Sequence, residues 1–314
     1  MRVTDSAFNS SFINQLNGLT SQQYNLQNQV TTGLRIQAPS DDPGAMEDTL
    51  NDQANVAAQT QYGNNITTLQ TRATSIYTVL QSLQAASSQA GEYATSAGNG
   101  VQDPSALQTD GSEVNGLLNQ VVALANTQDP STGQYLFGGT ASSQPPFVAT
   151  KDANGNITGV TYQGNATVNQ TDIGSGVSVT VDIPGANTTG TGARGLFTDS
   201  QSGADFINHL ISLRDDLNSG NAAAVTTTDS ANLQKDEDNI TYQVANNGVA
   251  QTHLDAASTL VTNNSTSLNT MISNSSSANM VQTMVQLNAA QNAYQAALES
   301  GVKVMQLSIL NYLS

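Results

Sequence analysis

The chain has 314 residues, of which 37% are hydrophobic and 5% aromatic, and it contains no Trp. This composition argues against one large globular core and suits long helices packed through small side chains. The formal net charge of −16, with only eight Lys and Arg residues, disfavours binding to nucleic acid and insertion into anionic membranes. The absence of Cys excludes disulfides and thiolate metal sites, and no window approaches the roughly 18 apolar residues of a membrane span.

Residues 6–32 predict a first amphipathic helix, which we expect to end at Gly33 because Gly readily adopts the left-handed backbone of a helix stop. Its apolar residues recur at steps of three and four, the spacing of helices that pack side by side. Gln23 is a gap in this line. The residues expected to pack are Phe12, Leu16, Leu19, Leu26 and Val30.

The next helix is predicted to begin at Pro43, directly after Asp41 and Asp42. Two neighbouring carboxylates could indicate acid/base chemistry or a cation site. A helix cap is the favoured interpretation, because Asp accepts hydrogen bonds from free backbone amides and Pro is tolerated at the first helical position. From Pro43 the heptad pattern continues to about Asn99, and a second helix starting at Asp103-Pro104 is expected to fold back on it.

Residues 145–197 change in composition towards Gly, Thr and Val. Alternating segments at 157–162, 167–172 and 177–183, separated by Gly-rich turns, predict a small domain of short antiparallel strands. The preceding Gly138-Gly139 pair is interpreted as a hinge. The 151–156 loop could suggest a calcium site, but it lacks the terminal Glu of such loops, so a solvated turn is favoured.

Two further helical stretches follow the strands. Ser202 and Asp205 suggest a capping-box variant before a helix over 206–217, and a second long helix is predicted from about Ala222 to Ile272. Its apolar line is interrupted by Asn, Gln and Ser.

The last stretch, Met280 to Leu313, predicts a long helix that needs a partner along its length. We expect it to pair antiparallel with the first helix, with Gln291 and Gly301 as gaps. The residues expected to make interhelix or intersubunit contacts are Met280, Met284, Leu287, Tyr294, Leu298, Met305, Ile309, Tyr312 and Leu313.

The predicted fold class is mainly α with an inserted small β domain, and the helices are long and coiled-coil-like with paired N- and C-terminal helices. Three parts are expected. Residues 1–42 and 273–314 form the paired terminal helices, residues 43–144 and 198–272 form a long helical rod domain, and residues 145–197 form the β domain.

Catalytic patterns are not found in the sequence. His209 and His253 lie in no metal-binding motif and are interpreted as residues of polar helix faces. We therefore predict no enzymatic activity, no catalytic residue, no cofactor and no metal.

Motifs at both ends and in the middle resemble the flagellin superfamily. The residues that carry the resemblance are Val30-Thr31-Thr32-Gly33-Leu34-Arg35-Ile36, Pro39-Ser40-Asp41-Asp42-Pro43, Tyr135-Leu136-Phe137-Gly138-Gly139, Pro145-Pro146-Phe147 and Gln306-Leu307-Ser308-Ile309-Leu310-Asn311-Tyr312-Leu313. The last three are similar to the hook-filament junction branch of this superfamily. Leu34 is a departure, because the family often has Lys there.

The resemblance implies a structural subunit of the bacterial flagellum that joins the hook-side junction to the flagellin filament. The alternative is a flagellin filament subunit. The implied partners are copies of the chain in a ring, the hook-side junction protein, flagellin, and a cytoplasmic export chaperone on the C-terminal helix. The implied location is extracellular, on the flagellum, after type III export without a cleaved signal peptide.

Overall fold

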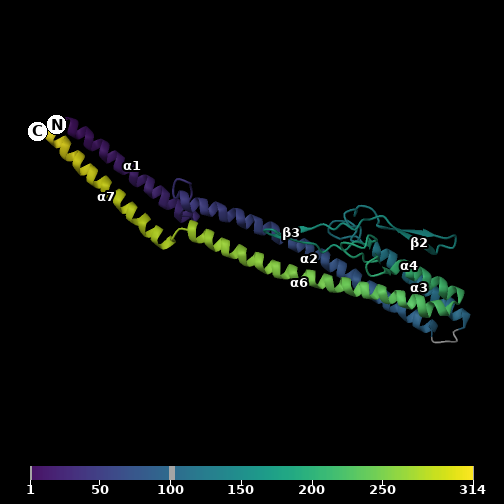
Figure 1. The fold of residues 1–314 in the computed structure, drawn as a ribbon. Helices are drawn as coiled ribbons and strands as arrows, with labels where there is room; N and C mark the ends of the chain where they lie inside the picture. The colour runs from purple at the N-terminus through teal and green to yellow at the C-terminus, as the bar shows by residue number, and fades with distance from the viewer. Residues whose placement is uncertain (1, 99–102, 314) are drawn as a thin grey trace. The chain divides into compact units, whose positions relative to one another are not determined.

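The structure is a computed structural model that describes the backbone of residues 2–98 and 103–313 and the side chains within residues 9–98, 103–304 and 306. Long helices and short strands make up the chain (Figure 1). The helices are α1 (Arg2–Thr32), α2 (Pro43–Gly98), α3 (Pro104–Ala125), α4 (Phe206–Ser219), α5 (Ala222–Ala224), the π-helical segment η1 (Val225–Asp229), α6 (Ser230–Ser276) and α7 (Met280–Leu313). The predicted class, mainly α with a small inserted β region, is confirmed.

The chain divides into two compact units. One comprises Met1–Gln59 with Asn263–Ser314, and the other comprises Thr60–Thr262. We call them the terminal unit and the central unit. This division is coarser than the three parts expected from the sequence, which stay a prediction.

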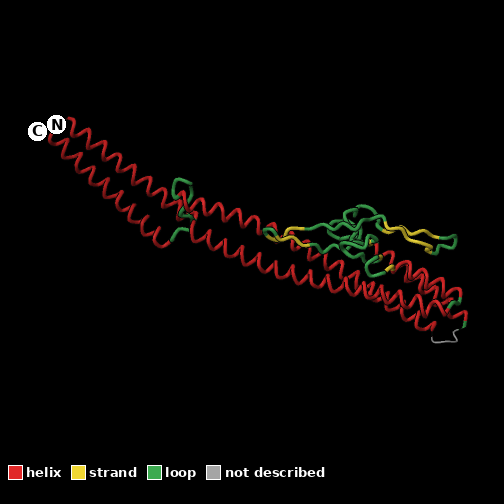
Figure 2. The backbone as a smooth tube through the Cα atoms, in the orientation of Figure 1, coloured by secondary structure: helices red, strands yellow, loops and turns green. Residues whose placement is uncertain are grey.

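In the terminal unit, α1 and α7 pack against each other in opposite directions (Figures 1 and 2). Gly33, with φ of +73°, ends α1 as predicted. The chain leaving α1 then pairs with the segment before α7: Ala278 N donates to Gly33 O at 2.8 Å and Arg35 N donates to Ser276 O at 2.7 Å. These bonds fix the register of the two helices at one end of the pair.

Asp41 and Asp42 have different roles at the start of α2. Asp42 Oδ1 accepts a hydrogen bond from Ala45 N at 3.2 Å, so the predicted cap is confirmed for this residue. Asp41 Oδ2 instead accepts from the backbone amides of Gln37 and Ala38, both at 2.9 Å. These two bonds hold the backbone of the connector between α1 and α2. Hydrogen bonds to the carboxylates hold the pKa of both residues below its ordinary value.

The core of the central unit follows the heptad line of α2. Ile76, Leu80 and Leu83 are fully buried, and the line continues through Ala90, Ala94 and Ala97. The change from large to small side chains lets neighbouring backbones approach. Buried residues of α3 and α4 complete the cluster, among them Val114, Leu118, Leu210 and Leu213.

The strands form three small sheets. They are β1 (Phe147–Lys151) with β2 (Ile157–Tyr162), β3 (Thr171–Gly174) with β4 (Val177–Val179), and β5 (Ala186–Asn187), β6 (Thr198–Asp199) and β7 (Ala204–Asp205). The first two pairs are antiparallel, as predicted. The strands β5 and β6 were not predicted, and they run parallel because the chain between them makes a loop rather than a hairpin.

Aromatic residues pack the strand region onto the helices. Phe197 lies between Phe137 and Phe147, with ring centroids 5.6 and 5.0 Å away. The Tyr162 hydroxyl donates to Phe137 O at 2.9 Å. The neighbouring Gly139, with φ of +63°, lies so close to Asn165 that a Cβ would clash with its backbone oxygen. The predicted hinge at Gly138-Gly139 is therefore wrong: this is a tightly packed turn.

Side-chain amides attach the irregular segments to α6. Asn239 Nδ2 donates to Gly195 O at 2.9 Å and to Leu196 O at 3.0 Å, and Gln243 Nε2 donates to Arg194 O at 3.0 Å. Asn239 and Gln243 are 1% and 3% exposed. The Asn and Gln residues that interrupt the apolar line of α6 thus satisfy buried carbonyl groups, which would otherwise each cost about 1–3 kcal/mol.

His209 and Asp205 differ from the prediction. His209 is not a surface residue of a polar face: its Nδ1 lies 2.7 Å from Asp236 Oδ2, and the Asp236 side chain is fully buried. Burial raises the pKa of Asp236, and the His209 contact opposes this shift. Asp205 precedes α4, but its side chain caps no backbone amide; Oδ1 accepts from Thr198 Oγ1 at 3.1 Å.

The segment η1 contains a buried carboxyl group. Asp229 Oδ1 accepts from Ser212 Oγ at 2.9 Å, whereas Oδ2 is buried without a hydrogen-bond partner among the described residues. Burial is the main cause that raises the pKa of Asp229, and the nearby Asp216 acts in the same direction. Because the folded state binds more protons than the unfolded state, stability falls as the pH rises from about 4 through the raised pKa.

We therefore expect Asp229→Asn to stabilise the central unit at pH 7, by about 1–3 kcal/mol, and to remove this pH dependence, because an amide has no proton to lose. Urea unfolding followed by circular dichroism at pH 4, 5, 6 and 7 measures both effects. Asp238→Asn, at an exposed position of α6, is the control and should change neither. An Asp229→Asn protein that is less stable at pH 7 would contradict the expectation.

Candidate assembly surface

One face of α7 is covered by α1. The covered residues recur at steps of four and three, and we call them the inner face. Thr283, Ala290 and Gly301 are buried, and Leu287, Tyr294 and Ala297 are half-buried. Near the middle, Gln23 Nε2 donates to Ala290 O at 3.0 Å, so Gln23 is a polar anchor rather than a gap. The inner face consists of Thr283, Leu287, Ala290, Tyr294, Ala297 and Gly301.

The side chains on α1 have the matching spacing. Leu26 is buried, and the other residues predicted to pack are half-buried. Phe12 contacts α7 at Gly301, where an added Cβ would lie 2.2 Å from Phe12 Cζ. Gly301 is therefore not an empty position, because it makes room for an aromatic ring. Alternating large and small residues let the two backbones approach closely. The half-buried residues are Phe12, Leu16, Leu19 and Val30.

We expect Gly301→Ala to weaken the α1–α7 pair by about 1–3 kcal/mol, because the new methyl group overlaps Phe12 and overpacking costs this much. Gly18→Ala is a matched control within α1, since a Cβ there meets nothing within 4 Å. That change should stabilise the helix by about 0.5–1 kcal/mol. Hydrogen exchange of α1 and α7 amides measures both. In the Gly301→Ala chain, Phe12→Leu should restore the amide protection of α1 and α7, because it removes the ring that the new methyl group overlaps. Equal protection in the Gly301→Ala and Gly18→Ala variants, or no such recovery, would contradict the proposed contact.

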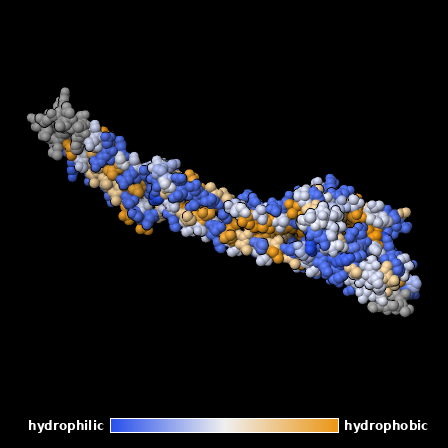
Figure 3. Space-filling view, viewed as in Figure 1, coloured by the Kyte–Doolittle hydropathy of each residue, from blue (hydrophilic) through white to orange (hydrophobic). Residues whose placement is uncertain are grey.

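A second face of α7 leaves large apolar side chains in solvent. Met280, Met284 and Leu298 are 37%, 49% and 41% exposed, and Val302 is 50% exposed. We call these four residues the outer face. Apolar residues accordingly reach the surface along the terminal helices (Figure 3). On α1, Ile13 and Tyr24 are also exposed, by 55% and 64%.

The prediction of one apolar line along α7 is thus wrong. Leu287 and Tyr294 belong to the inner face, whereas Met280, Met284 and Leu298 belong to the outer face. At 100° per residue, the two sets lie on adjacent sides of the helix. The side chains of Met305, Ile309, Tyr312 and Leu313, which were also predicted to pack, lie outside the described residues.

The described residues contain no cluster of three or more His, Asp or Glu side chains that could hold a metal ion. Within the same residues, no helix combines the length and the apolar character needed to cross a membrane.

Comparison with known proteins shows which proteins this chain is similar to. Residues 7–142 match the bacterial flagellin N-terminal helical region. Flagellar hook-associated protein 3 of Salmonella typhimurium is 34% identical over 160 residues, which are 47% of this chain and 48% of that protein. The Escherichia coli protein of the same name is 37% identical over 127 residues, 38% of this chain and 37% of that protein. The chain therefore spans half or less of the length of the curated relatives it matches.

Solved structures share the fold. A Vibrio parahaemolyticus structure assigned to the flagellar hook-associated proteins has a TM-score of 0.64 at 20% identity, with 76% of this chain and 100% of that chain covered. Xanthomonas campestris FlgL has a TM-score of 0.57 at 19% identity, with 71% and 99% covered. The chain thus resembles the flagellin N-terminal helical region over residues 7–142 and shares its fold with solved flagellar hook-associated proteins. These likenesses confirm the predicted resemblance to the flagellin superfamily.

Proposed function

We propose that this chain is a structural subunit of the bacterial flagellum, and that it joins the hook-side junction to the flagellin filament through its terminal helices. The relatives named flagellar hook-associated protein 3 support this role. The observation that carries it is the division of α7 into two faces, one covered by α1 and one exposed.

The outer face is suited to contact between subunits. Burial of one Met or Leu side chain contributes about 1.5–3 kcal/mol, so Met280, Met284 and Leu298 together offer a substantial contribution once a neighbour covers them. The inner face holds the helix pair together, and the outer face remains available for copies of the chain in a ring.

The same reasoning extends to the other partners. In the assembled flagellum the ring would contact the hook-side junction protein on one side and flagellin on the other. Before export, an apolar helix face needs protection in the cytoplasm, and an export chaperone that takes α7 into a groove would provide it. The proposed location is the extracellular flagellum, reached through the flagellar type III apparatus.

We expect the double change Met284→Asp and Leu298→Asp to abolish attachment of filaments to hooks and to leave the isolated chain folded. Two charges in the outer face would each have to be buried in the assembly, whereas in the isolated chain both positions are in solvent. Motility and electron microscopy of cells that carry the variant report attachment, and circular dichroism of the purified chain reports folding.

A matched control places the same charges on exposed apolar positions of α6. Val249 and Leu260 are 56% and 60% exposed, and Val249→Asp with Leu260→Asp should leave attachment intact. Normal filaments on cells that carry the α7 variant would contradict the proposal. Growth of the purified wild-type chain into long filaments by itself would instead favour the alternative, a flagellin filament subunit.

A further inference from the structure

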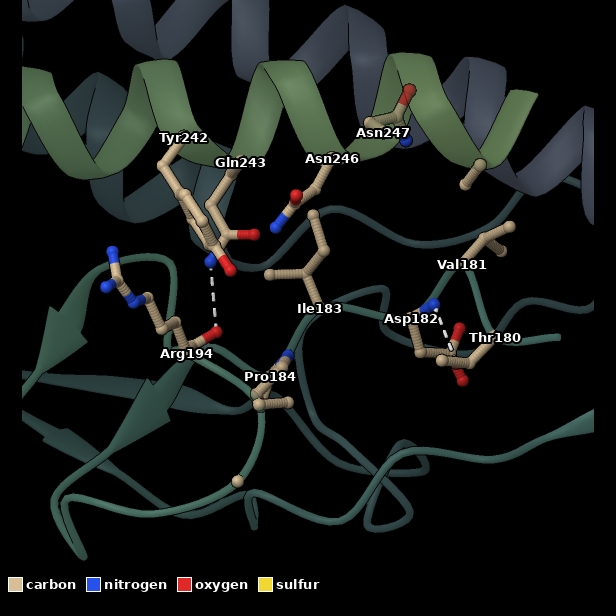
Figure 4. Close-up of a pocket in the computed structure, with 13 residues that line it drawn as sticks. Thr180, Val181, Asp182, Ile183, Pro184, Arg194, Tyr242, Gln243, Asn246 and Asn247 are labelled. Atoms are coloured by element: carbon tan, nitrogen blue, oxygen red, sulfur yellow. Dashed lines mark hydrogen bonds between the residues drawn. The ribbon is translucent and has the colours of Figure 1, made fainter. Parts of the chain in front are cut away.

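A groove in the central unit lies between α6 and the extended segment that follows β4 (Figure 4). Its volume is about 220 Å³. Residues 180–184 and 192–194 form one wall, and α6 residues from Tyr242 to Ala250 form the other. The proposed assembly contacts lie in the terminal unit and make no use of this groove.

The groove combines an apolar floor with amide groups. Val181 and Ile183 are 5% and 7% exposed and lie opposite the helix. Gln243 and Asn246 extend from α6 towards Ile183 (Figure 4). Gln243 is 3% exposed, and its Nε2 is held by Arg194 O at 3.0 Å. That bond fixes the amide so that its Oε1 remains available as an acceptor in the groove.

An aromatic ring closes one end of the groove. Tyr242 is 40% exposed, and the Arg194 guanidinium lies over its ring with Cζ 4.2 Å from the centroid. This stacking restrains the ring on one side. Asp182, also in the wall, pairs with Arg72, so its charge is compensated inside the protein. The groove therefore offers an apolar surface with neutral amide donors and acceptors, and its charged groups are the paired Asp182 and the Arg194 guanidinium over Tyr242.

We propose that this groove binds a neutral saccharide, with one sugar ring in the groove. A sugar ring has an apolar C–H face, which fits against Tyr242 and Ile183, and hydroxyl groups that both donate and accept. Gln243 Oε1 would accept from one hydroxyl, and the Asn246 amide can pair with another through its donor and acceptor atoms. The volume is below the roughly 300–1,000 Å³ of sites for drug-sized ligands, which favours one ring over an extended peptide.

The test is a titration of the full-length chain, followed by the NMR signals of the Gln243 and Asn246 side-chain amides. The probes are glucose, galactose and N-acetylglucosamine, and a neutral Gly-Ser-Ala-Ser-Gly peptide is the competing probe. We expect at least one sugar to shift these signals with a Kd of about 1 mM, the affinity expected for so small a ligand. Tyr242→Ala should weaken binding about tenfold or more.

Two further variants separate binding from folding. Asn246→Ala removes an exposed amide that makes no hydrogen bond to another described residue, and it should weaken binding about threefold or more. Thr241→Ala, at the exposed position before Tyr242, should leave the Kd unchanged. The proposal would be overturned if none of the sugars shifts the amide signals, if both groove variants bind as tightly as wild type, or if only the peptide binds.

Discussion

Replacement of Arg72 by Met is expected to destabilise the central unit by about 3–5 kcal/mol, because it leaves two carboxylates without their cation in a region of low exposure. Arg72 contacts Asp182 through Nε and Asp129 through Nη1, the latter at 3.2 Å. The three side chains are only 13%, 11% and 4% exposed. Met retains most of the apolar stem, so the loss reports the charge rather than the packing.

The control is an ion pair of the same residue types at the surface. Arg35 and Asp42 lie 3.1 Å apart with side chains 46% and 38% exposed, and Arg35→Met should cost no more than about 1 kcal/mol. Urea unfolding and hydrogen exchange of α2 amides measure both variants. Addition of Asp129→Asn and Asp182→Asn to the Arg72→Met chain should recover part of the loss. If Arg72→Met and Arg35→Met lowered the free energy of unfolding by similar amounts, burial of the Arg72 ion pairs would not increase their contribution to stability, contrary to the expectation.

Phe197→Ala is expected to cost about 3–5 kcal/mol in the central unit, the usual range for removal of a buried Phe. Its side chain is fully buried and contacts Phe137 and Phe147, so the cavity would open at the junction of the strand region with the helices. The neighbouring rings can relax only in part. We therefore expect amides of β1 and β2 to lose protection before those of the α2 heptad line.

Tyr24→Ala is the corresponding control, because Tyr24 is 64% exposed and its removal should change stability by less than about 0.5 kcal/mol. Thermal unfolding with hydrogen exchange gives the total loss and its location. A uniform loss of protection across the central unit would mean that the aromatic cluster belongs to one cooperative core with the helices, contrary to the expectation.

The long helices could be predicted from the sequence because their periodic signal is repeated many times. In α2 the line from Ile66 to Ala97 spans several heptads, and its members are buried. Alternation between turn residues similarly predicted β2 and, in part, β3 and β4, whereas β1 was not predicted. Such periodic patterns arise because the same kind of contact recurs along one helix or strand. The longer the segment, the less often apolar residues fall at the helix or strand spacing by chance.

The sequence pattern predicts Leu287 and Tyr294 of the inner face of α7 but not its small residues, because the predicted packing line consists of large apolar residues. Close helix pairing instead depends on Ala290, Ala297 and Gly301, whose size matters more than their hydrophobicity. Their spacing with Leu287 and Tyr294 is heptad-like, so a search for small residues at these steps could have found it. The direction of α1 was predictable, but the exact partner of Gly301 was not.

The contacts between distant segments had no local signal. His209 and Asp236 are 27 positions apart, and no motif links them. The η1 segment likewise depends on the packing of buried Val225 and Asp229, which the surrounding polar sequence conceals. The groove beside Tyr242 was also not predicted, because its two walls come from separate parts of the chain.

The row of side chains on α6 that holds the irregular segments has a mechanical consequence. Asp236 accepts from Asp205 N at 2.8 Å, while Asn239 and Gln243 donate to carbonyls of residues 194–196. A purely apolar interface can slide along a helix with little change in buried area. Here a shift of one residue, about 1.5 Å, would misalign all of these directional bonds together. The attachment should therefore resist shear along the helix axis up to a threshold and then yield in one step.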